Sequence, residues 1–166
     1  MEAAEFKEKF IPCKNRYYSI AYRMLLSGED AADAVQDLYL KLWGMRDKLD
    51  KVASPEALGV TMVRNLCIDK LRKKQKQPQN MAEDLMAMRQ IVAQEGTNDS
   101  ELKLQMIEAE IEKMPEGQKR IFYLRYHRDC SVKEISEITG LSSVNVRVIL
   151  NRLKNNLKKE LVNIAV

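Results

Sequence analysis

The chain of 166 residues contains few residues that interrupt helices, with only 6 glycines and 4 prolines. It also lacks any sustained stretch in which β-branched and aromatic residues alternate with polar ones, the pattern typical of half-buried strands. Leu, Ile, Met, Lys, Glu and Ala, most of which favour helices, are abundant. The sequence therefore predicts an all-α fold.

Cysteine and histidine are scarce as well. The cysteines, Cys13, Cys67 and Cys130, are odd in number and widely spaced, which is typical of reduced thiols rather than of a disulfide framework or a metal site. His127 is the only histidine, and a lone histidine near a helix end is more often structural or solvated than catalytic. Because a P-loop and a nucleophile–base pair are also missing, we expect no enzymatic activity, no metal and no cofactor.

Long apolar runs are absent too. No stretch reaches the 18 or so apolar residues that a membrane-spanning helix needs. The first ten residues are charged, unlike the apolar core of a secretory signal. We therefore expect a cytoplasmic protein with no membrane insertion.

The net charge of +4 is unevenly distributed. Residues 1–76 and 101–166 are basic, whereas residues 77–100 are acidic. Charge runs are usually solvated surfaces, but basic clusters close both basic parts, at 72–76 and at 152–159, and this clustering is also typical of nucleic-acid-binding modules. We interpret the chain as two small helical domains, 1–76 and 100–166, joined by a linker at 77–99.

Turn and capping residues predict the helices within this frame. Residues 3–26 have helical periodicity with a break at Pro12, and a second helix is expected over 30–46. Ser54 and Pro55 are a typical helix start, and that third helix runs to about residue 74. In the second domain, helices are expected over 99–113 and from Pro115 onward. The linker has room for one short helix.

Residues 131–154 have the pattern of a helix-turn-helix. Ser131 and Glu134 form a capping box, Gly140 suits the tight turn, and Ser142 can cap the second helix. The polar face of that helix suits base edges and phosphates, although an ordinary helical hairpin would share the pattern. The candidate DNA-binding residues are Ser131, Lys133, Ser142, Ser143, Asn145, Arg147, Asn151, Arg152 and Lys154.

The third helix has two distinct faces on a helical wheel. An apolar stripe for the core is expected at Leu58, Met62 and Leu66, with Val63, Cys67 and Leu71 alongside. A different face can follow a phosphate backbone and bond exposed bases, although a solvated basic helix end is an alternative. Its candidate residues are Thr61, Arg64, Asn65, Ile68 and Arg72, followed by Lys73 and Lys74.

The second helix has a mixed acidic face apart from its core stripe. Acidic groups suit a protein partner that presents Arg or Lys better than they suit DNA, although a plain solvated face is the simpler alternative. The residues of this face are Asp33, Gln36, Asp37, Leu40 and Lys41. Tyr39 and Trp43 are expected to pack in the core rather than bind a ligand.

Three segments resemble a known family. Residues 30–43 resemble the second conserved region of bacterial sigma factors, and residues 64–74 resemble their promoter-melting helix. Residues 114–125, together with the helix-turn-helix, are similar to the domain that reads the minus-thirty-five element. Their order and spacing resemble the extracytoplasmic-function (ECF) group.

The resemblance implies a function and a set of partners. The Asp33–Lys41 face would dock on the clamp of the largest subunit of core RNA polymerase, and the flap of the second-largest subunit would bind the second domain. The Arg64–Lys74 face would contact the minus-ten element of promoter DNA as it opens, and the helix-turn-helix would read the minus-thirty-five element. An anti-sigma factor is a further expected partner.

Two departures from the family pattern affect these expectations. Residues 54–60 lack the aromatic side chains that housekeeping sigma factors use to stack bases, which implies weak melting and leaves a flipped base to a loop residue within 47–54. Thr139 is polar where an apolar residue usually precedes the turn glycine, which is expected to loosen the turn slightly.

Two other functions fit parts of the pattern. A stand-alone repressor or activator would use the helix-turn-helix, with residues 1–76 as a dimerisation or sensor domain. A helical adaptor would bind protein alone. The adjacent faces at Asp33–Lys41 and Arg64–Arg72 favour a sigma factor, because a simple repressor needs neither.

Overall fold

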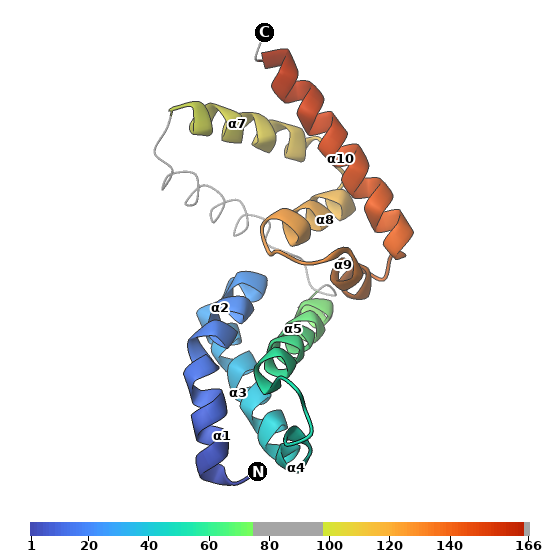
Figure 1. Cartoon of the computed structure of the whole chain (residues 1–166). Coiled ribbons are helices and arrows are strands. Elements are labelled where there is room, and N and C mark those ends of the chain that lie inside the picture. Colours follow the sequence, from blue (N-terminus) through green and yellow to red (C-terminus); the bar gives the residue numbers. More distant parts are fainter. Residues whose placement is uncertain (75–97, 165–166) are drawn as a thin grey trace. The chain divides into compact units, whose positions relative to one another are not determined.

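The computed structural model describes residues 1–74 and 98–164, and every regular element in these ranges is helical (Figure 1). The chain divides into two compact units, Met1–Gln77 and Pro78–Val166. The prediction of two all-α domains is therefore confirmed. The linker expected at 77–99, with its short helix, lies outside the described residues except for its last two positions.

The first unit contains the helices α1 (Ala3–Phe10), α2 (Lys14–Leu25), α3 (Gly28–Gly44), α4 (Arg46–Leu49) and α5 (Pro55–Lys74), with a short 3-10 helix at Ile11–Cys13. The break expected at Pro12 is this 3-10 turn. The Ser54 hydroxyl accepts a hydrogen bond from the Ala57 amide at 3.3 Å, as expected at a helix start. Helix α3 begins two residues earlier than predicted, because Ser27 caps it by accepting from the Asp30 amide at 3.2 Å.

Helices α2, α3 and α5 pack against one another and form the core of this unit. Tyr17 of α2 is fully buried, and its ring lies directly against Gly59 of α5. A Cβ atom at Gly59 would overlap the Tyr17 ring, so the missing side chain lets the two helices approach closely. Burial, with Cys13 beside the phenol, raises the pKa of Tyr17 well above its usual value.

The buried face of α5 differs from the predicted stripe. Leu58, Met62 and Leu66 are only half-buried, whereas Ile68, expected on the nucleic-acid face, is 3% exposed. Because α5 contacts both α2 and α3, neighbouring helices cover an arc of its surface that is rotated from the one that the apolar spacing indicates. The fully covered positions are Gly59, Val63, Cys67, Ile68 and Leu71.

The second unit contains α7 (Asn98–Glu112), α8 (Glu116–Tyr126), α9 (Val132–Thr139) and α10 (Ser143–Ile164). Ile111, Phe122, Tyr123 and Leu153 form a core cluster between α7, α8 and α10. None of the helices in the described ranges combines the length and the apolar composition that a membrane span requires.

The helix-turn-helix at α9 and α10 has the predicted caps. Ser131 and Glu134 form a reciprocal capping box, with hydrogen bonds of 2.9 and 3.1 Å. Gly140 has φ = 79°, the left-handed conformation that glycine adopts most readily. The Thr139 hydroxyl donates to the Ile135 carbonyl at 2.7 Å and accepts from the Leu141 amide at 3.3 Å. The polar residue before the glycine thus adds bonds across the turn, contrary to the expected loosening.

Candidate protein and nucleic-acid interfaces

The predicted protein-binding face of α3 is exposed. Ala34, Leu38 and Leu42 point into the core on the other side of the helix. Leu40, an apolar residue among charged neighbours, is 68% exposed. The exposed members of the face are Asp33, Gln36, Asp37, Leu40 and Lys41.

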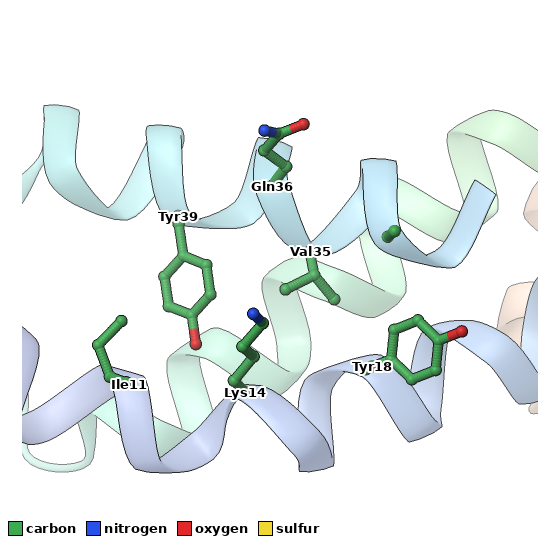
Figure 2. Close-up of a pocket in the computed structure, with 7 residues that line it drawn as sticks. Ile11, Lys14, Tyr18, Val35, Gln36 and Tyr39 are labelled. Atoms are coloured by element: carbon green, nitrogen blue, oxygen red, sulfur yellow. The ribbon is translucent and has the colours of Figure 1, made fainter. Parts of the chain in front are cut away.

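An apolar groove of about 510 Å³ runs along one side of this face, between α2 and α3 (Figure 2). Tyr39 projects from α3 toward α2, and its hydroxyl donates a hydrogen bond to the Phe10 carbonyl at 2.9 Å. Gln36 links the groove to the protein-binding face. The lining residues are Ile11, Lys14, Tyr18, Ala32, Val35, Gln36 and Tyr39.

The expected core packing of Tyr39 and Trp43 is only partly found. Tyr39 is half-buried and lines the groove, and Trp43 is partly exposed. The Trp43 ring packs edge-on against Phe6 at 5.1 Å, and the Arg46 guanidinium lies 4.4 Å from its centroid. Both aromatic side chains therefore pack at the edge of the core.

A second groove, of about 440 Å³, lies on the other side of the face, between α3 and α5. It is lined by charges of both signs, and the Lys70 ammonium lies 4.0 Å from the Asp37 carboxylate. Lys73 also lines this groove, so the structure brings it beside Asp37 and Leu40, members of the protein-binding face. The full lining is Asp37, Leu40, Lys41, Leu66, Asp69, Lys70 and Lys73.

The predicted nucleic-acid face of α5 is narrower than expected. Thr61, Asn65 and Arg72 are exposed along it, and Arg64 is half-buried beside them. Ile68 is buried and cannot contact a nucleic acid from this position, so its assignment to the face is wrong. The packing of α5 against two helices at once covers this position.

Two cations at the end of α5 already have acidic neighbours. The Arg72 guanidinium lies 3.7 Å from the Asp69 carboxylate, one turn earlier. Lys74 pairs with Asp30 at the start of α3. These pairs are exposed, so each contributes little to stability and can be exchanged for a phosphate contact at small cost.

The polar face of α10 is exposed over its first half. The Ser142 hydroxyl accepts from the Asn145 amide at 3.1 Å, and the Ser131 hydroxyl is engaged in the capping box, so both serines act first as caps. Ser143 is half-buried. The exposed candidates are Ser131, Lys133, Ser142, Asn145, Arg147, Asn151, Arg152 and Lys154.

A shallow groove of about 250 Å³ brings Arg147, Asn151 and Lys154 together. It also adds Arg125 and Tyr126 from the end of α8, which the sequence analysis missed. Arg125 donates a hydrogen bond to the Cys130 carbonyl at 3.1 Å, so its guanidinium is held next to the start of α9. The basic and aromatic residues that cluster just before the helix-turn-helix were the sequence feature that could have indicated their place in this groove. The rest of the lining is Val132 and Leu150.

His127 is buried in the second unit, which favours its structural reading over the solvated one. Among the described residues, no group of three or more His, Cys, Asp and Glu side chains is placed to hold a metal ion.

Comparison with known proteins matches each unit to a protein family model. Residues 12–77 match the family model for sigma-70 region 2, and residues 104–157 match a model for sigma-70 region 4. The chain is also similar to the ECF RNA polymerase sigma factor SigW of Bacillus subtilis (strain 168). The two are 28% identical over 158 residues, which cover 89% of this chain and 84% of that protein.

Proposed function

Because this chain belongs to the ECF group of sigma-70 factors, and so is an alternative sigma factor that directs transcription initiation, we propose that its two units divide the task. Such a factor binds core RNA polymerase and promoter DNA. Residues 1–76 dock on the polymerase and open the minus-ten element. Residues 100–166 read the minus-thirty-five element, and residues 77–99 connect the two.

The observation that carries the docking proposal is the exposed α3 face between two grooves. Asp33 and Asp37 offer charge to a partner that presents Arg or Lys, and Leu40 offers exposed apolar surface that such a partner can bury. We assign this face to the clamp of the largest polymerase subunit. The apolar α2–α3 groove extends it through Gln36, and Lys73 extends it through the α3–α5 groove.

Contact with the opened minus-ten strand is assigned to α5. Asn65 can bond an exposed base, while Arg64 and Arg72 can follow the phosphates. Lys74 joins them by exchanging Asp30 for a phosphate. The sequence predicts a loop over 47–54, but residues 47–49 lie in α4, so a loop residue within 50–54 is our candidate for holding a flipped base.

Reading of the minus-thirty-five element is assigned to α10. Arg147 and Asn151 lie one turn apart in the groove that Arg125 and Lys154 flank, which supports base contacts at the centre and phosphate contacts at the sides. The flap of the second-largest subunit would bind this same unit. An anti-sigma factor would act by covering the polymerase-docking or DNA-binding surfaces.

This division of labour assigns no catalysis to the chain, since phosphodiester synthesis belongs to the polymerase. It also places the factor in the cytoplasm, where the polymerase and the chromosome are.

Run-off transcription with purified core polymerase tests the proposal. The chain plus core should yield a promoter-dependent transcript that neither yields alone. A repressor or activator would bind promoter DNA without core and would leave core inactive on it. An adaptor would produce neither DNA binding nor transcript, and either result would contradict the proposal.

A further inference from the structure

Two valines on α10, Val144 and Val148, are exposed and do not pack in the core of the second unit. Val144 is 66% exposed and Val148, one turn later, is 40% exposed, whereas Val146 and Leu150 are buried on the opposite side. An exposed valine leaves apolar surface in water, and its branched side chain favours a helix less than alanine does. The core of the unit therefore gives no reason for valine at either position.

These valines share a stripe with the proposed base-reading residues. Val144, Arg147, Val148 and Asn151 follow the i, i+3, i+4, i+7 spacing of one helix face. The stripe lies in the first half of α10, directly after the turn at Gly140. In helix-turn-helix proteins this half of the second helix is the part that enters the major groove. The valines are thus directed at whatever Arg147 and Asn151 contact.

The major groove offers one apolar group to such side chains. Its edges are hydrogen-bond donors and acceptors, except for the C5 methyl group of thymine. A valine against an adenine or guanine edge would desolvate polar atoms without pairing them, which is unfavourable. A valine against a thymine methyl group buries apolar surface on both sides.

We propose that Val144 and Val148 contact thymine methyl groups in the minus-thirty-five element, an inference that rests on the proposed role of α10 in reading this element. Arg147 and Asn151 then read hydrogen-bonding edges, while the valines specify T·A pairs beside them. A protein partner on the same stripe is less favourable, because the stripe adjoins the basic groove at Arg125 and Lys154.

Replacing thymine by uracil isolates the contribution of the thymine methyl group to holoenzyme binding. Promoters are first selected from a random duplex pool with the holoenzyme reconstituted from the full chain and core polymerase. Each thymine of the upstream element is then replaced singly by deoxyuridine, which keeps base pairing and removes only the methyl group. We expect about three- to tenfold weaker holoenzyme binding at one or two positions, as burial of one methyl group implies.

Val144→Ala and Val148→Ala complete the test. Each variant should bind the thymine promoter about three- to tenfold more weakly and should lose its sensitivity to uracil at one position. Alanine favours helix, so the fold should be retained, as circular dichroism can verify. Leu102→Ala on α7 is the matched control, because Leu102 is also an exposed apolar residue, at 59%. It should keep full sensitivity to uracil.

Several results would overturn the inference while leaving the proposed function intact. These are a selected upstream element without thymine on either strand, binding that no uracil substitution weakens, and valine variants that weaken thymine and uracil promoters equally. Weaker binding of the variants to core polymerase without DNA would assign the valines to a protein contact instead. Failure of the holoenzyme to select any promoter would contradict the proposed function itself.

Discussion

At the scale of the residue, the absence of a side chain at Gly59 determines how closely α2 and α5 pack in the first unit. The Tyr17 ring occupies the space where a side chain at Gly59 would lie, so α2 and α5 can approach only because that side chain is absent. Tyr17 is among the largest fully buried side chains of the described residues. The point where α2 and α5 meet is therefore one of the most tightly packed of the first unit.

Gly59→Ala should destabilise the first unit by about 1–3 kcal/mol, since overpacking must displace the Tyr17 ring. Urea unfolding followed by tyrosine and tryptophan fluorescence measures the loss. Gly44→Ala is the matched control, because a Cβ there meets no neighbour within 4 Å. It should be neutral or slightly stabilising. Equal stability of the two variants would show that Tyr17 moves aside without cost.

Residues that act within one helical turn were the most predictable from sequence. Ser131, Glu134 and Ser54 specify their helix ends through bonds to backbone groups three residues away, so no tertiary information is needed. Ile68 was mispredicted because its burial depends on two helices that pack around α5. The start of the second helix was predicted two residues late, at residue 30, whereas α3 begins at Gly28 directly after its cap Ser27.

At the scale of the element, α3 has an exposed face that combines charged side chains with Leu40, and we propose this face for polymerase docking. We expect Asp37→Arg to weaken binding to core polymerase at least about tenfold, by inverting a charge in a complementary contact. The site is exposed, so helicity should remain native. Glu8→Arg, an equal charge reversal at an exposed position of α1, should leave the affinity unchanged. Unchanged affinity of Asp37→Arg in a binding titration would remove α3 from the interface.

For α5 we expect Asn65→Ala and Arg72→Ala to reduce open-complex formation without weakening core binding, because both side chains act on single-stranded DNA. Permanganate reactivity of promoter thymines is the measurement. Lys7→Ala on α1 removes an exposed cation from another helix and serves as the control. If both variants open linear duplex as well as the control does, this face is merely solvated.

For α10, the positions of Arg147 and Lys154 predict that their alanine variants differ in which property of promoter binding they lose. Arg147→Ala should relax base preference by about 1–3 kcal/mol at one or two positions of the upstream element, as loss of a bidentate guanine contact implies. Lys154→Ala should weaken all sequences alike and lower the salt slope by about one unit. Holoenzyme titrations against single-base variants at several salt concentrations separate the two. A uniform loss for Arg147→Ala would make it a phosphate contact.

At the scale of the whole molecule, a feature was predictable from sequence when it depends on one segment of the chain, and was not when it combines side chains from several helices. The division into two helical units follows from composition and charge along the chain, and both units are found. The grooves were not predictable, because each combines side chains from helices that are separate in sequence. Arg125 and Tyr126 beside Lys154, and Lys73 beside Asp37, become neighbours only through packing.

Two compact units with separate tasks should contribute independently to initiation. We assign Asn65 to melting and Arg147 to duplex recognition, and the two residues lie in different units. In transcription from a linear promoter, the free-energy losses of the double variant should therefore add within about 0.5 kcal/mol. A pre-melted bubble template should restore the Asn65→Ala component alone, because melting is then supplied while upstream recognition is still required. Strong non-additivity on the linear template, or restoration of both components by the bubble, would mean that the two units act as one body on the promoter.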